Sequence, residues 1–179
     1  VLVIGAGGLG SPVLYYLAAA GIGTIGIIDH DKVNISNLQR QILHHTKDLH
    51  NYKVDSAREK LEQLNPNIKL YTYKELFSEQ NAENLVREYD FVVDCTDNYE
   101  TKFRINDICV NTETPYSHAA VTAMGGEVMT IIPGSACYRC AFPEPPPEGE
   151  VPTSSELGIL GSVAGIIGSI QATEVVKYF

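Results

Sequence analysis

A glycine-rich pattern with the letters G-A-G-G-L-G occupies residues 5–10. It fits the G-x-G-x-x-G spacing of nucleotide-binding loops, and it follows an apolar run and precedes a helical pattern. Glycines at these positions permit a tight turn and let backbone amides approach phosphates, while the start of the helix adds positive potential. Asp29 ends the next apolar run, where a carboxylate can accept hydrogen bonds from ribose hydroxyls. Together these residues predict a nucleotide site.

Four side chains later in the sequence favour a triphosphate over a dinucleotide, namely Asn37, Arg40, Lys53 and Asp97. Mg²⁺ is commonly held by one or two carboxylates plus phosphate oxygens, and cationic side chains offset the charge on a leaving pyrophosphate. Taken singly, Arg40 or Lys53 also fits a solvated surface charge, and Asp97 also fits the N-cap of a helix. Whether they act together depends on how the chain folds.

Buried strands and amphipathic helices alternate along the chain. Continuous apolar runs suit strands of a parallel sheet, and strands are expected at residues 1–4, 25–28, 68–73, 91–95, 115–118 and 127–132. Helices are expected after residue 10, between residues 53 and 65, and at residues 79–88, 99–111 and 158–177. The second helix is expected to bury Val54, Ala57, Leu61 and Leu64.

The predicted fold class is therefore α/β, with a doubly wound, mostly parallel sheet, a Rossmann-like nucleotide-binding half and additional strands after it. In such a sheet the carboxyl ends of successive strands share one edge. Gly8, Asp29 and Asp97 are expected to meet at that edge.

Composition places the chain among globular domains. Its 179 residues are 44% hydrophobic and 20% charged, which suits a single domain over residues 1–179. The net charge of −9 disfavours a nucleic-acid partner, and the longest uncharged apolar run, residues 157–170, is shorter than the ~20 residues that cross a membrane. Four cysteines without a signal peptide suit the cytoplasm. The strand-like start and helical end indicate a sequence trimmed at both ends.

Two late segments differ from the rest. Residues 142–156 hold five of the nine prolines and four glutamates with no basic residue, so we expect a mobile crossover loop. Residues 158–177 are apolar on most sides, and we expect them to be buried in the core or in a subunit interface. Gly161 and Gly165 have the spacing of a membrane helix-pairing motif, but the expectation is close helix packing in a soluble protein.

Four motifs occur in order along nearly the whole chain: G-A-G-G-L-G at residues 5–10, S-N-L-Q-R-Q at 36–41, D-C-T-D-N at 94–98 and C-Y-R-C at 137–140. Together they resemble the adenylyltransferases that activate ubiquitin-like sulfur carriers. That family includes the molybdopterin-synthase and thiamine-biosynthesis adenylyltransferases and is related to ubiquitin-activating enzymes. Several long motifs together are far more specific than the glycine pattern alone.

The resemblance implies a nucleotide-binding set of Gly8, Asp29, Ser36, Asn37, Leu38, Gln39, Arg40, Lys53, Asp97 and Asn98. Within it, Gly8 would pack on the nucleotide and Asp29 would hold the ribose. The phosphates would be held by Ser36, Asn37, Arg40 and Lys53. Asp97 would bind Mg²⁺ with Asn98 beside it, and the catalytic residues would be Arg40, Lys53 and Asp97.

The reaction implied by the resemblance is attack on the α-phosphorus of ATP by the C-terminal glycine carboxylate of a small carrier ending in Gly-Gly. The products would be an acyl-adenylate and pyrophosphate, formed by a homodimer. The carboxylate is ionised at neutral pH, so positioning and charge neutralisation suffice without a general base. Two other functions stay open: an NAD-dependent oxidoreductase, and a noncatalytic subunit of a ubiquitin-like activating heterodimer, which is expected to lose phosphate ligands.

The cysteines separate into two kinds. Cys137 and Cys140 make half of a Cys₄ structural Zn²⁺ site, or else a reduced or disulfide-linked pair, whereas Cys95 and Cys109 are expected to be small buried residues. Some relatives carry a reactive cysteine before the last helix, and the corresponding position here is Ser154. A serine hydroxyl cannot form the thioester or acyl-disulfide of those enzymes, which favours a protein that only adenylates.

Overall fold

The computed structural model describes residues 1–147, 150 and 157–179. Its centre is a six-stranded sheet with the order β3-β2-β1-β4-β5-β6. The strands are β1 (Leu2–Ile4), β2 (Thr24–Ile28), β3 (Lys69–Tyr73), β4 (Val92–Asp94), β5 (Tyr116–Thr122) and β6 (Gly125–Ile131). Strands β1 to β5 pair in parallel, and β6 pairs antiparallel to β5. The predicted mostly parallel α/β sheet with additional strands is confirmed.

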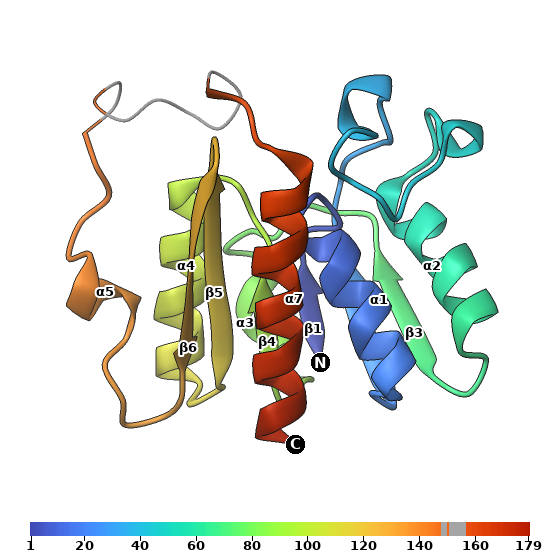
Figure 1. The fold of residues 1–179 in the computed structure, drawn as a ribbon. Helices are drawn as coiled ribbons and strands as arrows, with labels where there is room; N and C mark the ends of the chain where they lie inside the picture. Colours follow the sequence, from blue (N-terminus) through green and yellow to red (C-terminus); the bar gives the residue numbers. More distant parts are fainter. Residues whose placement is uncertain (148–149, 151–156) are drawn as a thin grey trace.

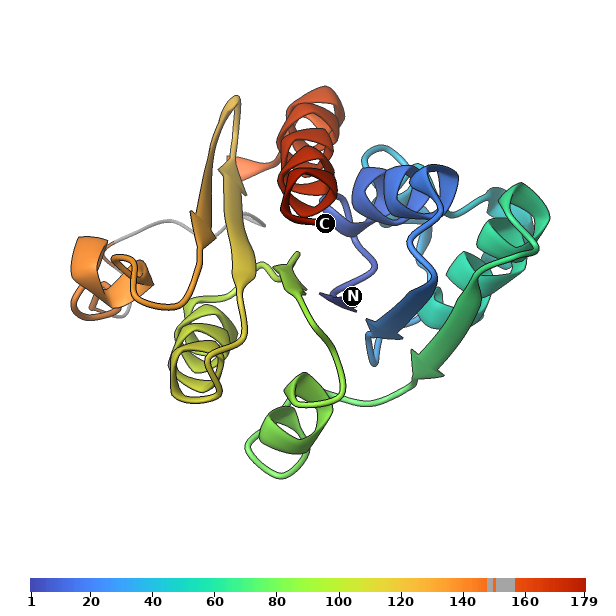
Figure 2. The same ribbon diagram turned by 90° about the horizontal axis from the view of Figure 1, so that it is seen from below.

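Helices cover both faces of the sheet (Figure 1). They are α1 (Gly10–Ala20), α2 (Lys53–Leu64), α3 (Ala82–Val86), α4 (Tyr99–Asn111), α5 (Tyr138–Ala141) and α7 (Gly161–Tyr178), with 3-10 helices at Ile35–Asn37 and Thr46–Asp48. Seen from below, α1, α2 and α7 lie on one face, and α3 and α4 lie on the other (Figure 2). None of the described helices is long and apolar enough to span a membrane.

The side chains of each strand point alternately to the two faces of the sheet, which explains why the strands are continuous apolar runs in the sequence. Val3 packs in the core cluster shared with α1, α2 and α7, whereas its neighbours Leu2 and Ile4 pack in the cluster shared with α3 and α4. Successive side chains of a strand point to opposite faces, so a strand covered on both sides is apolar at every position. The sheet core therefore lies on both faces.

The last long helix, α7, packs against α1 and against β5 and β6. Its buried side is lined by Ala164, Ile167, Gly168, Gln171, Ala172 and Val175. A side chain at Gly168 would place its Cβ 2.5 Å from the Leu9 carbonyl oxygen, whereas one at Gly165 would meet nothing within 4 Å. The predicted close helix packing is thus found at Gly168, which lies against the start of α1. Gly161 instead lies against the Gln39–Arg40 backbone, and Gly165 has open space around it.

Three other expectations differ in detail. Leu64, placed on the buried stripe of α2, is 47% exposed because it ends the helix. The helix expected at residues 79–88 is shorter, since Asn81 accepts a hydrogen bond from the Ser78 backbone N–H and starts the helix later. The expected crossover loop at 142–156 is described only at residues 142–147 and 150, so Ser154 lies outside the described residues.

Candidate functional site

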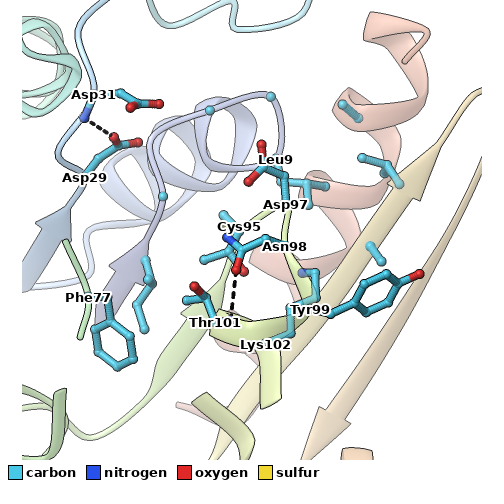
Figure 3. Close-up of a pocket in the computed structure, with 18 of the residues that line it drawn as sticks. Leu9, Asp29, Asp31, Phe77, Cys95, Asp97, Asn98, Tyr99, Thr101 and Lys102 are labelled. Atoms are coloured by element: carbon cyan, nitrogen blue, oxygen red, sulfur yellow. Dashed lines mark hydrogen bonds between the residues drawn. The ribbon is translucent and has the colours of Figure 1, made fainter. Parts of the chain in front are cut away.

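A cavity of about 460 Å³ opens at the carboxyl ends of β1, β2 and β4 (Figure 3). Strand order reverses beside β1, because β2 lies on one side of it and β4 on the other, and ligands of open α/β sheets bind at such a point. Six of the predicted site residues line this cavity: Gly8, Asp29, Arg40, Lys53, Asp97 and Asn98. The expected meeting of Gly8, Asp29 and Asp97 is confirmed.

The glycine loop runs from the end of β1 into the first turn of α1. Gly5 has a φ of +98°, and a Cβ there would lie 2.7 Å from the Cys95 carbonyl oxygen, so only glycine fits between β1 and β4. Gly8 lies beside the Arg40 side chain, since a Cβ on Gly8 would be 3.4 Å from Cγ of Arg40. Gly5, Gly7 and Gly8 therefore line the cavity with backbone and no side chain.

Asp29 ends β2 and braces the loop. Its Oδ2 accepts from the Ala6 N–H at 2.8 Å. Its Oδ1 accepts from the Asp31 N–H at 2.8 Å (Figure 3). Each carboxylate oxygen has two lone pairs, so one on each remains for a ligand hydroxyl. Asp29 can therefore hold the loop and a ribose at once.

Lys53 is a buried cation that lines the cavity. Its ammonium donates to Oδ2 of Asp31 at 2.8 Å, and the side chain of Lys53 is 7% exposed while that of Asp31 is 53% exposed. Burial opposes ionisation of Asp31, but the hydrogen bond and the charge of Lys53 outweigh it and lower the pKa of that carboxyl. Asp31 was not predicted as a site residue. Its position two residues after Asp29, at the same end of β2, could have indicated it.

Arg40 is brought to the cavity by a turn whose other residues face elsewhere. The Ser36 hydroxyl and backbone N–H both donate to Oδ1 of Asn34, and Oδ1 of Asn37 accepts from the Asn34 N–H. Arg40 donates to the Ser36 carbonyl at 3.3 Å. The expected phosphate ligands Ser36 and Asn37, and with them Leu38 and Gln39, do not line the cavity. In this structure they build the turn that carries Arg40.

Gln41, next in the chain, lines the cavity and is 4% exposed. Its Oε1 has no hydrogen-bond partner among the described residues. The sequence reading included Gln41 in a motif but gave it no role.

Asp97 and Asn98 take different tasks on the loop between β4 and α4 (Figure 3). Asn98 is the N-cap of α4, because its Oδ1 accepts from the Thr101 N–H at 2.9 Å. The alternative of Asp97 as the cap is therefore wrong. Asp97 is exposed, and its carboxylate has no hydrogen-bond partner among the described residues. A carboxylate that lines the cavity and has no partner among the described residues fits a Mg²⁺ ligand.

A buried charge network lies under that loop and was not predicted. Oδ2 of Asp94 accepts from Lys102 at 3.1 Å and bonds Nδ1 of His118 at 2.9 Å, while its Oδ1 accepts from the Thr96 hydroxyl at 2.6 Å. Burial opposes ionisation of Asp94, yet Lys102 and His118 outweigh it, so its pKa lies far below the usual range. The network fixes the segment that ends in Asp97.

The Cys137 and Cys140 thiols lie outside the cavity, at α5. Their sulfurs are 3.7 Å apart and both thiols are free. Two thiolates at Zn–S distances of about 2.3 Å in a tetrahedral site would be roughly 3.8 Å apart, so the pair fits one edge of such a site. Among the described residues no other His, Cys, Asp or Glu joins the pair as a ligand group. The expectation that Cys95 and Cys109 are buried is confirmed, and burial raises the pKa of both thiols.

The chain is similar to one protein family over its whole length and to proteins named as adenylyltransferases. The ThiF family matches residues 1–179. The chain is 43% identical over 179 residues to the "Adenylyltransferase and sulfurtransferase MOCS3" of Drosophila willistoni, covering 99% of this chain and 39% of that protein. It is 40% identical over 183 residues to the "Sulfur carrier protein adenylyltransferase" of Thermus thermophilus, covering 99% of this chain and 68% of that protein. The chain thus spans about two fifths of the length of the MOCS3 and uba4 relatives that it matches.

Solved structures agree on the fold. A crystal structure of E. coli MccB superposes with a TM-score of 0.84 at 24% identity, covering 99% of this chain and 55% of that one. A crystal structure of E. coli MccB with ATP gives a TM-score of 0.82 at 23% identity, with the same coverage. At this level of identity the likeness concerns the fold.

Proposed function

Because this chain belongs to the ThiF family, we propose that residues 1–179 form one adenylating domain that uses ATP to activate the C-terminal glycine carboxylate of a small ubiquitin-like sulfur carrier. The observation that carries the proposal is one cavity lined by the glycine loop, the cations Arg40 and Lys53, and the Asp97 carboxylate, which has no partner among the described residues. A dinucleotide needs the loop and Asp29 but has no use for the rest of this set. A noncatalytic subunit would be expected to lack Arg40, Lys53 and Asp97.

In the proposed reaction a carrier carboxylate oxygen attacks the α-phosphorus, and the bond from that phosphorus to the bridging oxygen of pyrophosphate breaks. Asp29 binds the ribose, and the glycine loop approaches the phosphates through its backbone. Arg40 and Lys53 neutralise charge that moves onto the leaving pyrophosphate. Lys53 can do so while still bonded to Asp31, because an ammonium has three N–H donors.

Asp97 is the residue that would hold Mg²⁺, since it lines the cavity and has no partner among the described residues. When bound, the ion would supply positive charge that neutralises the phosphate oxygens. The Asp97 carboxylate alone is negative and would repel them. Asn98 orients Asp97 by fixing the first turn of α4.

A homodimer is proposed as the assembly, with the outer face of α1 and α7 as its contact. This apolar groove is lined by Tyr15, Tyr16, Ile42, Gly165, Ile166 and Ile170 together with smaller residues. Ile166 is 61% exposed and Ile170 is 43% exposed in the single chain. An isologous contact between two copies would cover this face without any other partner.

Structural Zn²⁺ at Cys137 and Cys140 is proposed as well, with two further ligands from outside the described residues. The short helix α5, which carries Cys140 and is preceded by Cys137, is held against α4: the Tyr138 N–H donates to Oδ1 of Asn106 at 2.9 Å, and Arg139 donates to both carboxylate oxygens of Asp107. Zinc there would stabilise the fold, far from the phosphates. Free thiols of this kind suit the proposed cytoplasmic location.

Titrating the protein with ATP and with NAD, each with and without Mg²⁺, tests the proposal against its rivals. We expect ATP to bind more tightly with Mg²⁺ and NAD to bind weakly. Pyrophosphate exchange into ATP is then expected only when a carrier ending in Gly-Gly is added, and not with a carrier lacking its final glycine. Preferential binding of NAD would favour the oxidoreductase, and binding of neither nucleotide would favour the noncatalytic subunit.

A further inference from the structure

His44 lies buried behind the glycine loop, with 3% of its surface exposed. Its Nε2 is 2.8 Å from the Ala6 carbonyl oxygen, and its Nδ1 is 2.8 Å from Oγ of Ser56 on α2. A carbonyl oxygen only accepts, so the proton of the neutral ring must be on Nε2, and Nδ1 accepts from the Ser56 hydroxyl. Lys60 in turn donates to that hydroxyl oxygen at 2.9 Å. The ring is thus held in one tautomer and one orientation.

Both backbone polar groups of Ala6 are therefore hydrogen-bonded. Its N–H donates to Asp29 and its carbonyl accepts from His44. The peptide that joins Ala6 to Gly7 is trans and planar, so the Gly7 N–H points opposite to the Ala6 carbonyl and away from His44. Gly7 lines the cavity, and its N–H has no acceptor among the described residues.

Without a restraint this peptide would be free to turn over, because Gly7 has no Cβ to oppose the rotation. A turned peptide would present the Ala6 carbonyl oxygen, a partial negative charge, where the Gly7 N–H now lies. That oxygen would repel a phosphate. The orientation of one peptide therefore decides whether the loop attracts or repels an anion.

We propose that His44 is a positioning residue for phosphate binding: it holds the Ala6 carbonyl away from the cavity and so keeps the Gly7 N–H directed at a phosphate oxygen. The proposal rests on the proposed use of ATP and adds a residue outside the cavity to it. Burial lowers the pKa of His44, as do Lys53 and Lys60, against the opposing effects of Ala6 and Asp29. The ring consequently stays neutral near pH 7, in the state that fixes its tautomer.

Two amide substitutions separate the two ring contacts. In His44→Gln the carboxamide reaches the place of Nε2 and can still donate to Ala6, whereas in His44→Asn it reaches only the place of Nδ1 and bonds Ser56. His50→Asn is the matched control, because His50 is exposed and its φ of 71° suits asparagine. Calorimetry would measure the dissociation constants of Mg²⁺–ATP and of adenosine, which lacks phosphate, and thermal melting would show that each variant is folded.

We expect His44→Asn to weaken ATP binding by about tenfold, the effect of one lost hydrogen bond, and to change adenosine binding by less than about twofold. His44→Gln and His50→Asn are expected to bind both ligands within about twofold of wild type. Equal losses for ATP and adenosine would mean a merely structural role and overturn this inference alone. Wild-type protein that binds no ATP would overturn the proposed function together with it.

A second measurement covers the case in which His44→Asn fails to fold. Long-range ¹H–¹⁵N NMR spectra of the wild-type protein are expected to show a neutral ring protonated at Nε2 at pH 7. A proton on Nδ1 would contradict the contact with the Ala6 carbonyl, and the inference would be wrong.

Discussion

The polar residues of this site fall into two groups: those hydrogen-bonded to other parts of the chain, and Asp97, whose carboxylate is available to a ligand. Asp29, Lys53 and Asn98 are hydrogen-bonded within the chain, so they shape the site even when it is empty. Asp97 has no partner among the described residues. Substituting it should therefore affect ligand chemistry and leave the fold nearly unchanged.

Asp97→Asn is predicted to lower carrier-dependent pyrophosphate exchange by at least about a hundredfold, because the neutral amide cannot hold Mg²⁺ against the phosphates. The melting temperature should stay within about two degrees of wild type, since the side chain is exposed. Asn98→Asp is the comparison for stability: aspartate also caps a helix, so this variant should keep the start of α4. Exchange at the wild-type rate in Asp97→Asn would refute the metal assignment.

Acid should weaken the fold through Asp94. Its pKa is far below the ordinary value of about 3.9, so the unfolded chain takes up a proton there at a pH at which the folded chain does not. The stabilisation is fully present above pH ~4 to 5 and is lost as the pH falls further. Urea unfolding at a series of pH values between 7 and 3 measures this slope.

Asp94→Asn is expected to make that slope smaller and to cost roughly 3–5 kcal/mol at pH 7, because Lys102 is left buried without its counter-charge. The double variant Asp94→Asn with Lys102→Met should recover part of this loss. A double variant less stable than Asp94→Asn would show that Lys102 stabilises the fold through the Ala119 carbonyl, which it also contacts, rather than through Asp94.

At the scale of elements, the strands and helices were largely predictable and the contacts among them were not. The apolar runs and the helix stripes mark elements to within a few residues, because burial on two faces requires an apolar residue at nearly every strand position. The backbone carbonyls that Lys102 and His44 contact could not be predicted, since Ala119 and Ala6 lie on other elements of the fold. Spacing likewise could not show that residues 36–39 form a turn and that Arg40 alone enters the cavity.

The docking of α7 on α1 offers a test within one helix. Gly168→Ala is predicted to destabilise the fold by about 1–3 kcal/mol, because the added methyl group meets the Leu9 carbonyl and the Pro12 ring. Gly165→Ala is the control on the same helix. It has open space and should be neutral or stabilising by up to about 1 kcal/mol through helix propensity. Chemical denaturation compares the two, and equal effects would contradict the packing described here.

At the scale of the whole molecule, the described residues leave an apolar groove on α1 and α7 exposed. Ile166→Asp, in the middle of the α1–α7 groove, is predicted to convert a homodimer into monomers with little change in melting temperature of the monomer, because the side chain is exposed in the single chain. Val176→Asp lies on the same helix outside the groove and should leave the assembly unchanged. Sedimentation velocity distinguishes the outcomes, and an unchanged dimer in Ile166→Asp would place the contact elsewhere.

The order of the strands also determines when the chain can fold during its synthesis on the ribosome. Residues of β1 pair with β4, about ninety positions later, and α1 is covered only when α7 has been made. A ribosome-bound chain that ends before Gly161 thus presents the uncovered side of α1 as a site for chaperones and proteases, since distant contacts must form before the core is closed. Chains arrested before and after α7 should differ sharply in limited proteolysis, with protection acquired in a single late step.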